Sequence, residues 1–367
     1  MKKVGILTFS EADNYGAMLQ AYALQKYVSA MGFNCNQIRY RNMTIWKAYH
    51  YVPLRERPSL ISYIKKNVEL FVFRKKRRKF EEFRATCKMT QVVSSDGLQD
   101  EAKKYDKIIV GSDQVWNPRN TNGDMHFLLD FVNDDNKKVA YAASLGNTEF
   151  FSEFGKNAPV YLSQIPSISV REEKAAQFIR TCFNLYCISV CDPVLLLDRE
   201  EWKNCVSSTS HKDEYVFVYL LKPNKELVKG VNSLLDSEGL KAYVVPGVVN
   251  VVYQAKNIKR SKIILDAGPI ELISLLEGAK YVVTDSFHGT ALSIVLQKQF
   301  AVFVDEGTDN TNSRIDNILA VCNLNNRQIS DSKKIDVVKC EIDFDKVRGK
   351  LDEYKKISKE FLRSALS

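Results

Sequence analysis

Residues 281–297, YVVTDSFHGTALSIVLQ, join the pattern of a buried strand to the pattern of an apolar-faced helix through a polar turn. Residues 281–284 are aromatic or β-branched, and the apolar positions of 290–297 fall on one side of a helix. Similar strand–turn–helix units recur along the chain, and such alternation is typical of parallel sheets built by right-handed crossovers. The stretch therefore predicts an α/β fold.

The units fall into two series. The first runs from KVGILTF at 3–9 to DPVLLLDREEW at 192–202, and the second begins with YVFVYLL at 215–221, after a small polar linker at 204–214. A chain of 367 residues is also longer than one hydrophobic core usually serves. We expect two doubly wound, Rossmann-like domains that face each other across a cleft, at 1–204 and 205–340. A helical tail at 341–367 is expected to pack back on the first domain, and 41–62 to be an irregular excursion.

The composition is that of an ordinary soluble protein, with 45% hydrophobic and 26% charged residues. No apolar run approaches the roughly 20 residues that cross a bilayer. The eight cysteines form no CxxC pair, and scattered thiols in a long chain are typical of the cytosol. We expect a cytoplasmic protein, free or peripheral at the inner face of the membrane, with no metal site.

The net charge of +9 is concentrated most densely in RKKRRK at 74–79. One interpretation is a solvated helix with a buried aromatic face. The other is a surface that attracts an acidic membrane or a lipid diphosphate. Charge alone is no nucleic-acid signature, and we expect no nucleic-acid partner.

Two turns of the first series carry polar groups at the ends of expected strands. SEADNYGA at 10–17 places Asn14, Tyr15 and Gly16 at a helix start, where free amides bind anions, although Asn14 is equally suited to cap the helix. GSDQVWNP at 111–118 places Asp113 and Gln114 after a buried strand. Asp113 is a candidate general base or hydroxyl anchor, and the alternative is a helix cap.

Two further turns combine a cation or histidine with a helix start. Arg171, in SVREE, is unfavourable for the helix dipole unless an anion lies before it, and the alternative is a surface pair with a glutamate. In the opening stretch, Ser286, His288, Gly289 and Thr290 surround a helix N-terminus that favours an anion. The alternative for His288 is a buried, hydrogen-bonded side chain. Arg314, before a later helical stretch, is a candidate second guanidinium for the same anion.

Six stretches, taken in order, resemble the polysaccharide pyruvyl transferase family: NYGAMLQAYALQ, DKIIVGSDQVWN, YAASLG, SVREE, DPVLLL and GAKYVVTDSFHGTALSIVL. The resemblance covers roughly residues 3–325. It implies a fold similar to that of GT-B glycosyltransferases. It also implies transfer of pyruvate from phosphoenolpyruvate to a sugar as a cyclic ketal, with release of phosphate. The phosphate-holding arginine and histidine of the family would correspond to Arg171 and His288. We expect 1–204, with Arg171, to be the acceptor side and 205–340, with His288, to be the donor side.

The candidate residues agree with this chemistry. Phosphoenolpyruvate is a compact polyanion that guanidinium groups and helix amides bind well, and it is a donor substrate, so no cofactor is expected. His288 suits a general acid or a phosphate ligand, and Asp113 a base. The acceptor is expected to be a sugar, free or lipid-linked. Three alternatives are a nucleotide-sugar glycosyltransferase, a family member with another anionic substrate, and a non-enzymatic two-domain protein that binds an anion or an acidic surface.

Overall fold

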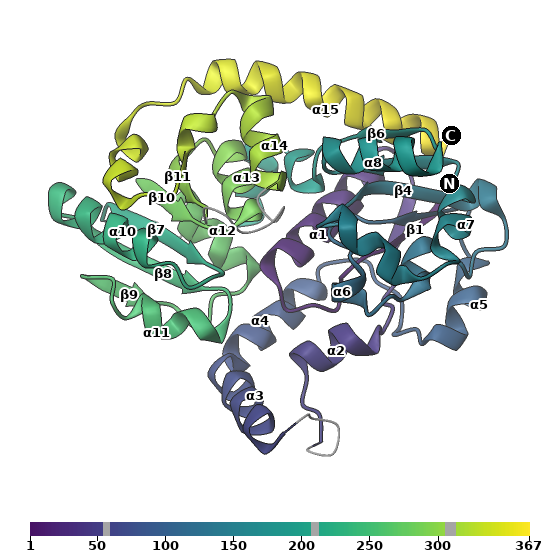
Figure 1. The fold of residues 1–367 in the computed structure, drawn as a ribbon, viewed down its shortest axis with the longest axis horizontal. Helices are drawn as coiled ribbons and strands as arrows, with labels where there is room; N and C mark the ends of the chain where they lie inside the picture. Colours follow the sequence, from purple (N-terminus) through teal and green to yellow (C-terminus); the bar gives the residue numbers. More distant parts are fainter. Residues whose placement is uncertain (54–58, 207–212, 305–312) are drawn as a thin grey trace. The chain divides into compact units, whose positions relative to one another are not determined.

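The computed structural model describes residues 1–53, 59–206, 213–304 and 313–367, so part of the expected linker, 207–212, lies outside the described residues (Figure 1). The chain divides into two compact units. Unit 1 comprises 1–70, 81–196 and 353–367, and unit 2 comprises 71–80 and 197–352. Each unit contains a six-stranded sheet whose strand pairs are all parallel. The prediction of two doubly wound parallel sheets is confirmed.

The sheet of unit 1 has the strand order β2-β1-β3-β4-β5-β6. Its strands are β1 (Lys3–Leu7), β2 (Asn34–Gln37), β3 (Lys107–Val110), β4 (Lys138–Ala143), β5 (Ser167–Val170) and β6 (Cys187–Ser189). The order reverses between β1 and β3. In open parallel sheets, ligands bind outside the carboxyl ends of the strands at such a reversal. The turns after β1 and β3, which contain Asn14 and Asp113, lie at this point.

Most of the helices numbered up to α9 belong to unit 1, but α9 and most of α4 belong to unit 2. Figure 1 labels all of them except α9. They are α1 (Tyr15–Ala30), α2 (Met43–Tyr49), α3 (Leu60–Val72), α4 (Arg74–Arg84), α5 (Leu98–Ala102), α6 (Pro118–Thr121), α7 (Ala158–Ser163), α8 (Glu173–Phe183) and α9 (Arg199–Lys203). The irregular excursion predicted at 41–62 is therefore wrong in part. Asn42 caps α2 by accepting the Ile45 amide at 2.9 Å, and α3 begins at Leu60.

The sheet of unit 2 has the order β12-β11-β10-β7-β8-β9, the order of the dinucleotide-binding Rossmann fold. Its strands are β7 (Tyr215–Leu220), β8 (Lys241–Pro246), β9 (Ser261–Ile263), β10 (Tyr281–Thr284), β11 (Gln299–Phe303) and β12 (Gln328–Ile329). The order reverses between β7 and β10. The edge strands β9 and β12 have only three and two residues, too few to show a hydrophobic period.

The helices from α10 onward follow these strands and end in a long terminal helix. They are α10 (Lys225–Glu238), α11 (Val252–Ala255), α12 (Pro269–Glu277), α13 (Phe287–Val295), α14 (Ser313–Cys322) and α15 (Phe344–Leu366). The end of α15 belongs to unit 1, where the Ser358 hydroxyl accepts the Cys191 amide at 2.8 Å. The predicted return of the C-terminal helix to the first domain is confirmed.

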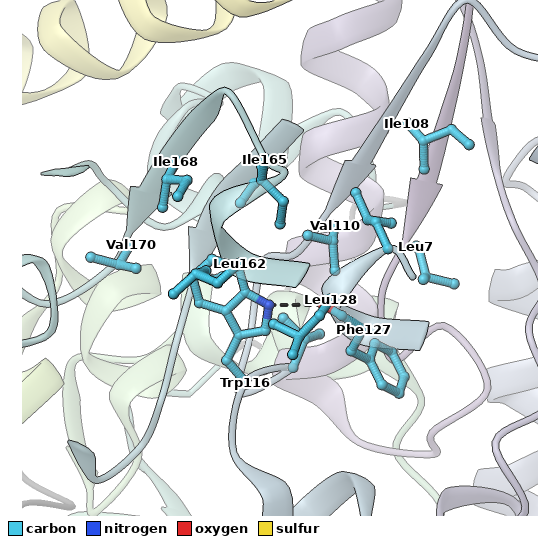
Figure 2. Packing of buried hydrophobic residues seen from close by; sticks show 14 of the residues in the cluster. Leu7, Ile108, Val110, Trp116, Phe127, Leu128, Leu162, Ile165, Ile168 and Val170 are labelled. Atoms are coloured by element: carbon cyan, nitrogen blue, oxygen red, sulfur yellow. Dashed lines mark hydrogen bonds between the residues drawn. The ribbon is translucent and has the colours of Figure 1, made fainter. Parts of the chain in front are cut away.

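The core of unit 1 is packed around Trp116, which follows β3 (Figure 2). The indole is fully buried and its Nε1 donates to the Phe127 carbonyl at 2.8 Å. Leu7, Val110 and Val170 bring the strands into the same cluster. Because Trp116 is fixed on both its apolar and its polar side, the turn that carries Asp113 has a rigid support.

The cationic run 74–79 forms the first part of α4, and its charges are divided between surface and interior. Phe73 and Phe80 are buried, as expected for an aromatic face. Lys76 is buried as well and donates to the Gly247 carbonyl at 3.1 Å, and Lys79 lies 2.8 Å from the Glu271 carboxylate. The run is thus not a continuous cationic surface.

Among the described residues, none of the helices combines the length and apolar character needed to cross a membrane.

Candidate functional site

A buried ionic cluster lies beyond the carboxyl ends of β3, β5 and β6 of unit 1. Arg171 follows β5 and has only 2% of its side chain exposed. Its guanidinium lies 2.5 Å from the Asp192 carboxylate, 3.4 Å from Asp113 and 3.8 Å from Glu172. Burial by itself would lower the pKa of Arg171, but the charges of these carboxylates outweigh it and raise the pKa.

The surroundings of Arg171 differ from both interpretations of its sequence. It is not a surface residue, and the negative charge expected before it is present as carboxylates of the chain itself. Three carboxylates around one guanidinium make the cluster locally negative, which disfavours a phosphate and favours a hydroxyl ligand. The arrangement holds Asp113 in place. A phosphate-binding role for Arg171 stays a prediction.

The turn after β3 presents Asp113 in an unusual backbone conformation. Asp113 has φ of 74°, and its Oδ1 accepts the Gln114 amide at 2.9 Å. Gly111 has φ of 108°, and a Cβ there would lie 2.3 Å from the Tyr141 carbonyl oxygen. The Gln114 side-chain oxygen accepts from Asn117 at 2.8 Å, so this predicted ligand also stabilises its own turn.

Tyr49, which the sequence analysis missed, lies near both the turn after β1 and Asp113. Asn14 caps α1 by accepting the Ala17 amide at 3.2 Å, and its side chain contributes to the pKa of Tyr49 of α2 in the lowering direction. Burial and the charges of Asp13 and Asp113 raise the pKa of Tyr49. Tyr15 and Gly16 are buried in the first turn of α1. Asn42, as an N-cap before spaced apolar residues, is the signal that would have revealed α2 and Tyr49.

The second cluster lies at the start of α13 in unit 2. The helix begins at Phe287, because the Ser286 hydroxyl accepts the Gly289 amide at 3.3 Å, so His288 lies in its first turn and not in the preceding turn. His288 is 9% exposed, and its ring centre is 5.0 Å from that of Phe287. The structure also brings Arg314 to this point, with its guanidinium 5.8 Å from the centre of the Phe287 ring.

The remaining predicted residues of this cluster support the helix start. The Thr290 hydroxyl donates to the Ser286 carbonyl at 2.9 Å, and Gly289 lies against Thr284 at the end of β10. Backbone amides at a helix start and a nearby guanidinium are suited to an anion. Ser286, His288, Gly289, Thr290 and Arg314 are thus assembled in one unit, as expected. Their role as ligands stays a prediction.

Asp285 is a second residue that the analysis of the sequence missed. Its carboxylate oxygens accept the amides of Leu221 at 2.8 Å and Lys222 at 2.7 Å. Burial raises its pKa to about 6, although these two bonds act in the opposite direction. Asp285 therefore ties the turn after β10 to the turn after β7, at the reversal of strand order where ligands are expected. The sequence signal was an aspartate directly after a strand.

No group of three or more His, Cys, Asp or Glu side chains suited to a metal ion occurs within the ranges that the structure describes. The expected absence of a metal stays a prediction.

A model of the polysaccharide pyruvyl transferase family matches residues 14–306, which contain both clusters except Arg314. The chain belongs to this family. As a member of the polysaccharide pyruvyl transferase family it is a transferase enzyme. No curated protein is significantly similar to the chain in sequence.

Solved structures of UDP-GlcNAc 2-epimerases share the fold. The Methanocaldococcus jannaschii enzyme, in complex with UDP-GlcNAc and UDP, is 15% identical with a TM-score of 0.50, and the match covers 92% of each chain. The enzyme from Rickettsia bellii is 12% identical with a TM-score of 0.51, and the match covers 100% of this chain and 96% of the other. These similarities confirm the GT-B-like architecture of this family member.

Asp285 predicts a pH dependence of stability. The pKa of Asp285 is about 6 in the folded protein and exceeds the ordinary 3.8. Its contribution to the free energy of unfolding is therefore present at low pH and is lost as the pH rises through 6. Relative to Asp285→Asn, the wild type should lose about 1 kcal/mol of stability between pH 5 and pH 7. The amide introduced by Asp285→Asn would keep one acceptor oxygen, which adds only a pH-independent offset. Thermal midpoints of both proteins across this range test the prediction, and parallel curves would contradict it.

Gly289 predicts a steric effect on the helix that carries His288. A Cβ at Gly289 would lie 2.6 Å from Thr284 Oγ1, which donates to the Tyr219 carbonyl at 2.8 Å. Gly289→Ala should therefore destabilise the protein by about 1–3 kcal/mol, as overpacking does. Gly349→Ala is the control, because no atom lies within 4 Å of its Cβ position apart from its chain neighbours and the backbone of its own helix. Gly349→Ala, within α15, should stabilise by about 0.5–1 kcal/mol. Equal unfolding midpoints for the two variants would disprove the close contact.

Proposed function

We propose that the chain transfers pyruvate from phosphoenolpyruvate to a sugar of a polysaccharide or glycan precursor as a ketal, with release of phosphate. The observation that carries the proposal is the family match over 14–306. The polar residues at the strand-order reversal of each sheet are consistent with the proposal, because the two units provide two separate chemical environments.

The cluster of unit 2 is proposed to bind the donor. His288 and the amides of the first turn of α13 would face the phosphate, and Arg314 would add a guanidinium that pairs with a phosphate or a carboxylate. Ser286 and Thr290 would support the helix start. A histidine at this position can donate a proton or hold the departing phosphate.

The cluster of unit 1 is proposed to bind the acceptor. Asp113 would accept a proton from the attacking sugar hydroxyl, and its conformation is supported by Arg171 and Trp116. Asn14, Gln114 and the missed Tyr49 would supply further hydrogen bonds to hydroxyl groups. The family resemblance also implies that Arg171 contacts the phosphate of the donor, and its replacement tests which role dominates.

The reaction needs two hydroxyl groups of the acceptor. Protonation of the methylene carbon of phosphoenolpyruvate makes C2 electrophilic, and the first hydroxyl attacks C2 as its proton passes to a base. The C2–O bond to phosphate then breaks, and the second hydroxyl attacks the same carbon. Of the two hydroxyl protons, one ends in the new methyl group and the other on phosphate, so the products are the ketal and inorganic phosphate.

The proposal is tested by measuring phosphate release from phosphoenolpyruvate with a panel of sugar acceptors, together with the mass of the product. We expect phosphate release that depends on an acceptor and yields a pyruvyl ketal. The similar M. jannaschii enzyme was solved with UDP-GlcNAc and UDP. Thermal stabilisation by a nucleoside diphosphate, without any response to phosphoenolpyruvate, would favour a nucleotide-sugar transferase instead.

A further inference from the structure

Helix α3 exposes an apolar stripe, and its other side, which includes Lys66, Glu69 and also Leu70, is half-buried. Ile61, Ile64, Val68 and Phe71 follow at spacings of three and four residues, which places them on one face of the helix. Their side chains are 66%, 53%, 53% and 65% exposed. No residue of α3 is buried. This is the reverse of the usual arrangement of a surface helix, whose apolar face lies on the protein.

The polar side of α3 lies toward the rest of unit 1. Tyr63 contacts Tyr51 through their hydroxyls at 2.8 Å. Glu69 pairs with Lys66 at 2.8 Å, and both side chains are less than one third exposed. The charge of Glu69 also contributes to the raised pKa of Tyr49. The helix is therefore oriented by polar contacts on one side, which leaves the apolar stripe facing outward.

Cations border the apolar stripe. Lys65, Arg74 and Lys75 are exposed, and Glu69 is the only acidic residue between 59 and 79. The Arg74 guanidinium lies 4.2 Å from the centre of the exposed Phe71 ring. A basic rim around exposed apolar side chains is the pattern of helices that lie in the interface of an anionic membrane. A second copy of the chain would bring the same cations against each other, which disfavours a dimer through this face.

We propose that the exposed stripe of α3, formed by Ile61, Ile64, Val68 and Phe71, docks on an anionic lipid surface with Lys65, Arg74 and Lys75 at the headgroups. This inference goes beyond the proposed reaction and does not rest on it. It also centres the membrane contact on the preceding helix, with only Arg74 and Lys75 of the run 74–79 at its border, because Lys76 of that run is buried.

The test is sedimentation of the full chain with vesicles of phosphatidylcholine alone or of phosphatidylcholine with phosphatidylglycerol. We expect binding to the anionic vesicles only, with affinity that falls as salt is raised. The double variant Ile64→Asp/Val68→Asp should bind them at least tenfold more weakly. The control is Val160→Asp/Ile357→Asp, whose side chains are 55% and 48% exposed and which changes the net charge equally. This control should bind like the wild type.

A second pair of variants tests the charges without touching the apolar stripe. Lys65→Gln/Lys75→Gln should weaken binding severalfold, whereas Lys174→Gln/Lys350→Gln, at exposed positions elsewhere, should not. No binding by the wild type, or equal binding by all variants, would overturn the proposal. A dimer in solution that Ile64→Asp/Val68→Asp separates would overturn it in favour of a second copy. Vesicle binding is measured without turnover, so failure here is distinct from failure of the proposed reaction.

Discussion

Arg171→Ala is expected to destabilise the folded protein by about 3–5 kcal/mol, the cost of breaking a buried ion pair from one side. The Arg171 side chain is 2% exposed and that of Asp192 is 0% exposed, and 2.5 Å separates their charged atoms. Without the guanidinium, the Asp192 carboxylate would stay buried beside Asp113 and Glu172 with no compensating cation. Chemical unfolding, monitored by a signal from unit 1, measures this loss of stability.

Two comparisons make this expectation specific. Arg119 pairs with Glu153 at 2.8 Å, but the side chains are 56% and 43% exposed, so Arg119→Ala should cost less than about 1 kcal/mol. The double variant Arg171→Met/Asp192→Asn should regain much of the stability, because it removes both charges. If Arg171→Ala unfolds at the same denaturant concentration as Arg119→Ala, the ionic cluster is not a structural element.

Arg171→Lys separates the two roles of this residue in a protein that keeps the charge. If Arg171 mainly holds Asp113, turnover should fall while the affinity for phosphoenolpyruvate, measured by calorimetry, stays unchanged. If it binds the donor phosphate as the family resemblance implies, the affinity should fall too, because lysine cannot form the bidentate contact.

His288→Ala is expected to lower phosphate release from phosphoenolpyruvate by about 10²–10⁴-fold, the range for loss of a general acid or base. The reason is the position of His288 in the first turn of α13, beside the ring that Arg314 approaches. His126→Ala is the control, since His126 of unit 1 is bonded to Asp130 at 2.6 Å and lies outside both clusters. Steady-state phosphate release measures both.

Calorimetry with phosphoenolpyruvate then distinguishes the functions of His288. Retained affinity with lost turnover indicates proton donation, whereas loss of both indicates a phosphate ligand. The assignment of the donor site to α13 would be wrong if His288→Ala released phosphate as fast as His126→Ala.

Much of the fold could be predicted because the central strands are largely apolar runs of four to six residues. Strands such as β7 and β10 are continuous hydrophobic runs, as expected where both faces of a parallel sheet are covered. The edge strands β9 and β12 could not be found, because two or three residues show no period. Helix α2 was missed because its polar cap was interpreted as part of a loop.

The sequence by itself determined the two parallel sheets, the family, the turns that contain Asp113 and Arg171, and the helix start that contains His288. These follow from local patterns, since a strand, a cap and a helix are encoded in neighbouring residues. Only the tertiary structure decided the partners. The bond from Asp285 to the Leu221 amide spans 64 residues, and Arg171 meets Asp192 over 21 residues, because parallel sheets bring the ends of distant strands together. The tertiary structure also placed Arg171 in a buried cluster with the carboxylates of Asp113, Glu172 and Asp192, an arrangement that no local pattern contains.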